Sequence, residues 1–246
     1  MGDAPDHRAG GLPRYTFAFQ PIVDAVSRRV VSHEALVRGP AGEPAPSILQ
    51  AIPASEIYRF DEESRVVALE LAARLRFEGQ LNLNLMPGGL QASGTAIEST
   101  LAVARRCRVG FERVVIEVTE GEIIADPAQF ARAMNVYRGM GVRVAIDDFG
   151  SGFAGLSLLA DFQPDAIKLD MQLVRGIERR GPRQAIARAV IQVCFDLGMD
   201  VIAEGVETED EYRWLVDEGV RLFQGYLFAR PGFECLPQPS FPPSAA

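Results

Sequence analysis

Short runs of apolar residues alternate with longer segments of helical periodicity along most of the chain. Apolar runs of this length are typical of β-strands. Eight of them predict strands at residues 15–20, 29–36, 80–85, 113–118, 142–147, 165–170, 200–205 and 220–225. Amphipathic segments between them predict helices at residues 61–77, 95–107, 126–140, 183–198 and 209–219. Pro127 and Gly198 are start and stop signals for two of these helices.

Eight strands that alternate with helices predict an α/β fold, a TIM-like (β/α)8 barrel, whereas a doubly wound sheet would usually have fewer strands. No helical pattern separates the first two strands, so we expect a hairpin and therefore one antiparallel strand. Residues 14–238 are expected to form a single domain. Residues 1–13 are rich in Gly, Pro and Asp and are interpreted as a disordered N-terminal tail, and residues 239–246 are interpreted as a C-terminal tail.

The pattern within the strands predicts which side chains face the barrel axis, because successive residues of a strand point to opposite faces. In the run 142–147, Val144 and Ile146 would face the helices while Ala145 and Asp147 face inward. The same rule turns many polar side chains inward. We expect them near the C-terminal mouth, where such barrels carry active sites: Gln20, Glu34, Asn82, Asn84, Glu117, Lys168, Asp170, Glu204 and Gln224.

Composition narrows the possible classes of function. The net charge is −8 and no basic tract is present, which argues against binding of a nucleic-acid polymer. No apolar run approaches the roughly 18 residues of a membrane span, and the first residues lack a signal-peptide core. We therefore expect no membrane contact and a cytoplasmic location.

Cysteine and histidine offer little chemistry in this chain. Cys107, Cys194 and Cys235 lack the paired spacing of a zinc site or a disulfide framework and are interpreted as buried, reduced thiols. With only two histidines, His7 and His33, Ser-His-Asp chemistry is nearly excluded. Strand alternation turns His33 away from Glu34, so we expect a partly buried side chain there.

Five acids are expected at the barrel mouth: Glu34, Glu117, Asp147, Asp148 and Glu204. One such acid alone would be interpreted as a helix cap or a solvated rim residue. Together they would repel one another, and Lys168 cannot neutralise all of them, so divalent cations are the natural remedy. Oxygen ligands favour Mg²⁺, Mn²⁺ or Ca²⁺ over zinc. The adjacent Asp147 and Asp148, on the last strand residue and just beyond it where the chain turns, suit a bridged pair of ions that acts on a phosphodiester.

Two alternatives use the same residues differently. The stretch GSGFAG, with Gly150, Gly152 and Gly155, matches the G-x-G-x-x-G pattern of dinucleotide-binding turns, and Asp170 follows at about the expected distance. Acids directly before Gly150 would oppose a pyrophosphate, and the match lies mid-chain rather than on a first strand. An enolase-type barrel would need a separate Lys or His base on the opposite side.

Several motifs resemble EAL domains. Glu34-Ala35-Leu36 is followed by Val37-Arg38, and the other matching motifs come in family order: QPIVD (20–24), NLNLMP (82–87), EVTEGE (117–122), AIDDFGSGFAGLSLL (145–159), IKLD (167–170), VIAEGVET (201–208) and FQGYLFARP (223–231). The resemblance implies a TIM-like barrel with one antiparallel strand. It also implies a bacterial signalling enzyme that hydrolyses cyclic di-GMP to linear pGpG with two Mg²⁺ or Mn²⁺ ions, while Ca²⁺ is expected to inhibit or only to bind.

The resemblance also assigns roles to individual positions. It implies metal ligands at Glu34, Asn84, Glu117, Asp147, Asp148 and Glu204, with Asp147 as the bridge. Lys168 and Glu204 are implied as catalytic residues. Implied substrate contacts are Gln20, Leu36, Arg38, Asp170, Gln224 and Pro231. Loop and regulatory positions are implied at Glu120, Gly150, Gly152 and Glu207.

Departures from the family pattern are few, namely Met86, Phe153 and His33, and none of them replaces an implied ligand. The motifs NLNLMP and DFQPDAIKLD are similar to those of EAL domains attached to BLUF photosensors, although we expect no sensor domain within these 246 residues. A homodimer is expected, with a sensor or signalling protein as a further partner. A receptor that binds cyclic di-GMP or a protein without turnover stays open as the alternative to an enzyme.

Overall fold

In the computed structural model, which describes residues 11–89, 97–119, 127–150 and 155–242, one sheet closes on itself as a barrel. The sheet order is β2-β3-β4-β5-β6-β7-β8-β1-β9, and β1 also pairs with β2. The strands are β1 (Thr16–Asp24), β2 (Arg29–Arg38), β3 (Gln80–Asn84), β4 (Val114–Thr119), β5 (Arg143–Phe149), β6 (Ala166–Leu169), β7 (Asp200–Ala203), β8 (Leu222–Phe223) and β9 (Gly232–Phe233). The eight predicted strands and the predicted barrel are confirmed.

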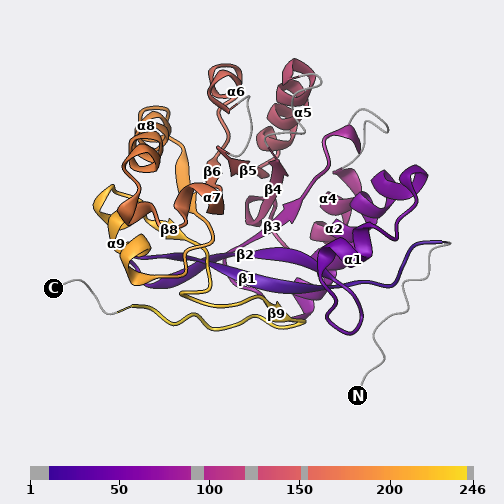
Figure 1. Cartoon of the computed structure of the whole chain (residues 1–246). Helices are drawn as coiled ribbons and strands as arrows, with labels where there is room; N and C mark the ends of the chain where they lie inside the picture. Colours follow the sequence, from indigo (N-terminus) through magenta and orange to yellow (C-terminus); the bar gives the residue numbers. More distant parts are fainter. Residues whose placement is uncertain (1–10, 90–96, 120–126, 151–154, 243–246) are drawn as a thin grey trace.

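The hairpin β1–β2 supplies the one strand that runs against the others. β1 pairs antiparallel with β2 from Thr16–Arg38 to Asp24–Arg29, and it pairs antiparallel with β8 through Val23 and Asp24. All pairings from β2 to β8 are parallel. β1 therefore closes the barrel from both sides, as the absence of a helical pattern between the first two strands predicted (Figure 1).

Helices follow most of the strands and lie outside the sheet (Figure 1). They are α1 (Ala45–Leu49), α2 (Ile57–Arg74), α4 (Glu98–Arg106), α5 (Pro127–Gly139), α6 (Gly155–Asp161), α7 (Met171–Val174), α8 (Gly181–Asp196) and α9 (Glu209–Asp217). The five predicted helices are confirmed, and α5 begins at Pro127 while Gly198 follows the end of α8. The helices α1, α6 and α7 were not predicted, because four to seven residues are too few for a helical period to stand out.

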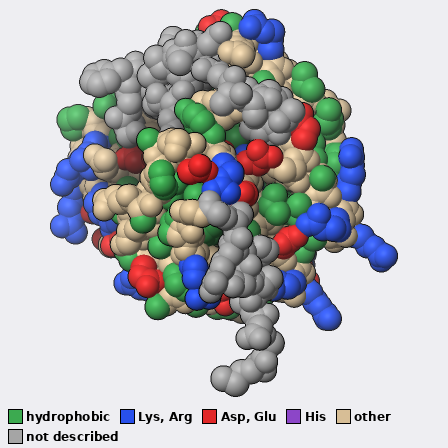
Figure 2. Space-filling model, turned by 90° about the vertical axis from the view of Figure 1, so that its right-hand side faces the viewer, with side chains coloured by type: hydrophobic (Ala, Val, Ile, Leu, Met, Phe, Trp, Pro, Cys, Tyr) green, Lys and Arg blue, Asp and Glu red, His purple; other side chains and the backbone are tan. Residues whose placement is uncertain are grey.

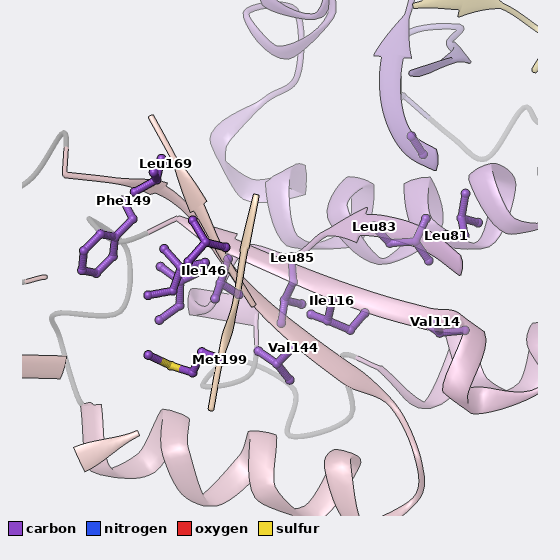
Figure 3. Packing of buried hydrophobic residues seen from close by; sticks show 14 of the residues in the cluster. Leu81, Leu83, Leu85, Val114, Ile116, Val144, Ile146, Phe149, Leu169 and Met199 are labelled. Carbon is purple, nitrogen blue, oxygen red and sulfur yellow. The ribbon is translucent and has the colours of Figure 1, made fainter. Parts of the chain in front are cut away.

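Two apolar clusters fill the molecule on either side of the strands. The larger one packs the outward faces of the strands against the helices and includes Leu81, Leu83, Ile116, Val144 and Ile146 (Figure 3). The smaller one lies inside the barrel and consists of Ile22, Val115, Ala145, Ala166 and Ile202. The predicted alternation of inward and outward side chains is confirmed. The inward apolar residues occupy the end of the barrel away from the mouth, which we call the lower barrel, and the inward polar residues lie at the mouth.

The described end of the chain packs against the barrel. β9 pairs with β1, and the backbone N–H of Ser240 donates to the carbonyl of Phe228 at 2.9 Å. The Phe241 ring meets the Phe228 ring edge-on at 6.0 Å, and Arg28 donates to the carbonyl of Pro242 at 3.0 Å. Residues 239–242, the first half of the segment interpreted as a C-terminal tail, thus have specific partners.

The cysteine prediction needs a correction. All three thiols are free, as expected, but only Cys194 is buried, whereas Cys107 is half-buried and Cys235 is exposed. Cys235 follows β9 at the surface, where no helix covers the chain, and nothing in its local sequence distinguishes it from a core residue. The buried His33 agrees with the prediction, and burial lowers its pKa to about 4.

Charged side chains of both signs are interspersed on the face shown in Figure 2, with hydrophobic side chains between them. Among the described residues, no helix has the length and apolar character to span a lipid bilayer.

Gly225 makes the closest backbone approach among the described glycines, beside the segment that joins β7 to α9. A Cβ atom at Gly225 would lie 2.0 Å from the carbonyl oxygen of Val206 and 2.4 Å from its nitrogen. Two backbone hydrogen bonds hold these segments together, from Val206 to Gln224 at 3.2 Å and from Leu227 to Val206 at 3.0 Å. The two segments can only be this close because residue 225 has no side chain.

Gly225→Ala is therefore expected to lower the free energy of unfolding by about 1–3 kcal/mol, the usual cost of overpacking. Urea denaturation followed by circular dichroism measures the change. Gly139→Ala is the matched control, since a Cβ atom there would meet nothing within 4 Å. Equal stability of the two variants would contradict the prediction.

Candidate active site

The ammonium group of Lys168 lies at the centre of the barrel mouth. Lys168 is on β6, its side chain is buried, and Nζ contacts one oxygen of each of four carboxylates. The distances are 3.2 Å to Glu34, 3.0 Å to Glu117, 3.2 Å to Asp147 and 2.7 Å to Glu204. Strands β2, β4, β5 and β6 and the end of β7 thus deliver their inward side chains to one point, as alternation predicted.

Burial and charge act in opposite directions on these groups. Burial lowers the pKa of Lys168, but the surrounding carboxylates together raise it well above its ordinary value. Burial raises the pKa of Glu117 to about 8 and raises that of Glu204 as well, although Lys168 opposes both shifts. The mouth therefore has more negative charge than one ammonium group can stabilise, and additional positive charge there would be favourable.

Two groups of carboxylates at the mouth have the spacing of cation sites. Glu34, Glu117 and Asp147 form one group, and Asp147, Asp148 and Glu204 form the other; in each, the ligand atoms lie within 4.8 Å of one another. Asp147 belongs to both groups, and its bridging role stays a prediction. The donors are all oxygen atoms, which suits Mg²⁺, Mn²⁺ or Ca²⁺.

The remaining implied ligand, Asn84, lies at the exposed end of β3, directly opposite Glu117 in the parallel pairing of β3 and β4. Because paired residues of parallel strands share a face of the sheet, the Asn84 side chain lies on the same face as Glu117. The oxygen Oε2 of Glu117 is buried and has no hydrogen-bond partner among the described residues. A buried, unsatisfied carboxylate oxygen fits a cation ligand.

A β-bulge allows the adjacent acids Asp147 and Asp148 to serve the same mouth. Between β5 and β6 the register shifts, since Ile146 pairs with Ile167 but Phe149 pairs with Leu169. The strand thus continues through Asp148 to Phe149, instead of turning directly after Asp147 as expected. Asp148 has a φ of 55°, which is uncommon for residues other than glycine. Such bulges reorient side chains next to active sites.

The electrostatic surroundings of Asp148 differ from those of Asp147. Desolvation, the charge of Asp147 and a hydrogen bond with the Asp170 carboxyl group raise the pKa of Asp148 to about 6. Asp170 is itself the N-cap of α7, where its side chain accepts from the backbone N–H of Gln172 at 2.7 Å. Asp170 therefore contacts Asp148 and at the same time begins a helix.

A pocket of about 320 Å³ opens above the acids. Small-molecule sites commonly measure roughly 300–1,000 Å³. Seven of the predicted site residues line it, namely Gln20, Glu34, Asp147, Asp148, Glu204, Glu207 and Gln224. The sequence did not indicate its other lining residues, which are Met171, Arg175, Gly205, Gly225 and Tyr226. Gly205, Gly225 and Tyr226 lie within the motifs VIAEGVET and FQGYLFARP, and Met171 and Arg175 follow IKLD, but no role was predicted for them.

Hydrogen bonds and ion pairs fix the walls of this pocket. Gln224 donates to Glu34 at 2.7 Å and to Gln20 at 3.2 Å, and Gln20 donates to the carbonyl of Ala229 at 3.1 Å. Arg175, also in the lining, forms an ion pair with Glu207 at 2.5 Å, and the hydrogen bond from Arg175 lowers the pKa of Glu207. The lining thus contains neutral amides and a guanidinium group.

Some predicted residues lie elsewhere. Among the described residues, Leu36, Arg38, Asp170 and Pro231 are not part of the pocket lining. Arg38 donates to the carbonyl of Val37 at 2.7 Å. Glu120 and Gly152 lie outside the described residues.

Gly150 follows β5 with a φ of 95°. A dinucleotide fingerprint would follow the first strand of an open, doubly wound sheet, so the barrel does not support that interpretation of GSGFAG.

A buried ion pair on α2 supports the end of β3. Arg65 Nη1 and Asp61 Oδ2 are 2.6 Å apart, and both side chains are almost fully buried. Arg65 also donates to the carbonyl of Asn84 at 3.2 Å, and Asp61 accepts from the backbone N–H of Met86 at 3.1 Å. The pair thus holds the backbone on both sides of the turn that carries Asn84. An Asp and an Arg four residues apart are common on exposed helices, so sequence reasoning missed this pair.

Comparison with known proteins decides the family. Residues 9–231 match the sequence model of the EAL domain. The chain belongs to the EAL domain family. A relative is the blue light- and temperature-regulated antirepressor BluF of Escherichia coli K12, which is 37% identical over 227 residues. The match covers 92% of this chain and 56% of BluF, so the chain spans little more than half of that relative.

Two solved EAL structures are similar throughout the barrel. A standalone versatile EAL protein from Vibrio cholerae O395, in its c-di-GMP-bound form, is 41% identical with a TM-score of 0.88, covering 92% of this chain and 95% of that one. Klebsiella pneumoniae BlrP1, in a manganese and cyclic di-GMP complex, is 44% identical with a TM-score of 0.86, covering 94% and 59%. The predicted family is confirmed, and so is the predicted likeness to blue-light-regulated relatives.

Arg65→Met tests the pair beneath this EAL site. The change leaves Asp61 buried without its cation, which should lower the free energy of unfolding by about 3–5 kcal/mol. Urea denaturation measures it. The double variant Asp61→Leu/Arg65→Met removes both charges and should recover part of the loss. The prediction fails if the single variant is as stable as the wild type.

Proposed function

We propose that this EAL domain is a metal-dependent phosphodiesterase that hydrolyses cyclic di-GMP to linear pGpG with two divalent cations, Mg²⁺ or Mn²⁺. Hydrolysis adds one water molecule across a P–O bond, which opens the ring and leaves a phosphate at one end and a hydroxyl group at the other. The proposal places the enzyme in bacterial signalling, where it lowers the level of a second messenger.

The observation that carries the proposal is the shared carboxylate of Asp147. It joins two acid groups whose members are Glu34, Glu117, Asp147, Asp148 and Glu204. Against these five carboxylates stands the single ammonium of Lys168, which leaves four negative charges when every group is ionised. Two divalent cations would balance this charge. A pair of bound cations would supply Lewis acidity toward the phosphodiester oxygens.

The side chains of the pocket have complementary tasks in this proposal. Lys168, at the centre of the carboxylates, would orient the attacking water, and Glu204, its nearest partner at 2.7 Å, would accept the proton of that water. Gln20 and Gln224 present amides that suit a guanine edge or a phosphate. Arg175 presents a guanidinium group, whose planar fork suits phosphate oxygens.

Relatives support both the substrate and the metals. The V. cholerae structure contains c-di-GMP, and BlrP1 forms complexes with cyclic di-GMP and either manganese or calcium. E. coli PdeR, 40% identical over 116 residues, is named a cyclic di-GMP phosphodiesterase. We propose that Ca²⁺ fills the same site in this chain but supports binding rather than turnover.

A turnover assay tests the proposal. The protein is incubated with cyclic di-GMP in Mg²⁺, Mn²⁺, Ca²⁺ or EDTA, and the products are separated by liquid chromatography. We expect pGpG with Mg²⁺ or Mn²⁺ only. Glu34→Ala removes one carboxylate of the first acid group and should lower turnover by more than about 100-fold. Residues that only orient a metal ligand usually have effects of about 10–100-fold, and the loss of a ligand should exceed them. Asp217→Ala, an exposed acid at the end of α9, is the matched control. An inactive wild type in both metals refutes the proposal.

A second candidate is a receptor without turnover, because BluF, the relative with 37% identity, is named an antirepressor. In that case the same pocket would bind cyclic di-GMP, and the consequence would be contact with a protein. Calorimetry in Ca²⁺ and in EDTA, beside the turnover assay, separates the two functions. Tight binding without hydrolysis in Mg²⁺ would favour the receptor.

The proposal includes a homodimer, a cytoplasmic location and a sensor or signalling protein as a partner, in keeping with the family resemblance. BluF and BlrP1 both extend well beyond the part that this chain matches, which supports a sensor partner. Light scattering measures the oligomeric state.

A further inference from the structure

The carboxylate of Glu117 has two donors on one oxygen, while its other oxygen has no donor among the described residues. Oε1 accepts a hydrogen bond from Asn82 Nδ2 at 2.7 Å and lies 3.0 Å from Lys168 Nζ. Oε2 is buried without a hydrogen-bond partner. Glu117 itself is fully buried, so water does not compensate for the difference. The two oxygens are therefore fixed in different roles.

Lys168 alone cannot fix this orientation. An ammonium group has three N–H donors, but Lys168 faces four carboxylates at 2.7–3.2 Å. At any moment at least one carboxylate lacks a direct N–H from it. Asn82 contributes a separate donor to Glu117, at a shorter distance than Lys168 does.

Asn82 is in turn oriented by Ser32. The amide nitrogen of Asn82 faces Glu117 and its carbonyl oxygen faces away. An ionised carboxylate that binds a cation requires this orientation, because it only accepts hydrogen bonds. There the hydroxyl of Ser32 donates to Oδ1. Ser32 and Asn82 are buried on neighbouring strands, and Asn82 pairs with Glu34 in the register of β2 and β3. Ser32, Asn82 and Glu117 thus form a continuous chain of two hydrogen bonds.

We propose that Asn82 is a positioning residue that, held by Ser32, fixes Oε1 of Glu117 and so leaves Oε2 as the atom that binds a divalent cation. The inference rests on the proposed function only for the presence of a cation at this site. Partners that orient a metal ligand commonly change metal affinity by about 10–100-fold when they are removed.

Asn82→Leu tests the proposal, because leucine has a similar size and no hydrogen-bonding group. Mn²⁺ is titrated by calorimetry without nucleotide, and circular dichroism and thermal unfolding confirm the fold. We expect Mn²⁺ affinity to fall by about 10–100-fold. Turnover should recover in part at saturating Mn²⁺, because occupancy is then restored. Thr100→Val is the matched control, since Thr100 is equally buried on α4 and its hydroxyl has no hydrogen-bond partner among the described residues.

A second pair of variants separates the effect of the Ser32 hydroxyl group on Mn²⁺ binding from the effect of side-chain shape. Ser32→Val and Ser32→Thr introduce side chains of the same shape, but only threonine keeps the hydroxyl. A cavity of about 30 Å³ beside Ser32 leaves room for an added methyl group. We expect Ser32→Val to bind Mn²⁺ roughly 10-fold more weakly than Ser32→Thr. Loss of an outer partner of a metal ligand commonly lowers metal affinity by about 10–100-fold, and this value is the lower end of that range.

The outcomes distinguish this inference from the proposed function. A wild type that binds Mn²⁺ but does not hydrolyse cyclic di-GMP overturns the proposed function, whereas the affinity differences still decide the role of Asn82. A folded Asn82→Leu with wild-type affinity overturns the inference, as does a loss that Thr100→Val shares. If Asn82→Leu does not fold, equal affinities of the two Ser32 variants overturn it. A wild type that binds no Mn²⁺ overturns both.

Discussion

Everything at the mouth of this barrel depends on charge balance around one buried ammonium group. Lys168 lies within 3.2 Å of four carboxylates that come from four different strands or strand ends. Without the ammonium group these acids would repel one another in a site that little water reaches. With it, they remain together, but burial and the neighbouring carboxylates still raise the pKa values of Glu117 and Glu204. The site thus stays assembled and still favours cations.

Apolar and charged side chains occupy different levels of the barrel, and this separation allows so many charges to gather at the mouth. Lower inward positions carry Val115, Ala145 and Ile202, which pack inside the barrel, and the inward position two residues after each of them carries an acid. Outward positions pack against the helices and hold the strands in place (Figure 3). Because the core is apolar on both sides, the polar side chains have only the mouth to occupy. The β-bulge at Asp147 and Asp148 then adds a second acid where regular alternation would allow one.

Much of this arrangement could be predicted from local sequence. Strand alternation alone placed Glu34, Glu117 and Lys168 on the axis, and the missing helix between the first two strands predicted the antiparallel β1. Periodicity could not reveal features that depend on distant contacts. The Asp61–Arg65 pair gains its role from a carbonyl nineteen residues later, and the bulge appears only when β5 is paired with β6.

Pocket residues such as Arg175 and Tyr226 could not be predicted for the same reason. They enter through loops whose course depends on the closed sheet, so no local pattern marks them. For Cys235 the local sequence led to a wrong prediction instead of none. Cysteine is usually buried, but this thiol lies at the surface. In both cases the tertiary structure, rather than the local pattern, determines the surroundings of the side chain.

The amino-acid composition gives the central ammonium group one more property. Lys168 is the only lysine among the 246 residues, all other basic side chains except the two histidines being arginine. Nitrogen-15 labelling of lysine side chains would therefore produce a single ammonium resonance, which originates at the centre of the mouth and nowhere else. Amine-directed coupling, in turn, finds no exposed lysine, because this one is buried. The 246 residues thus contain a single lysine reporter, which lies at the centre of the active site.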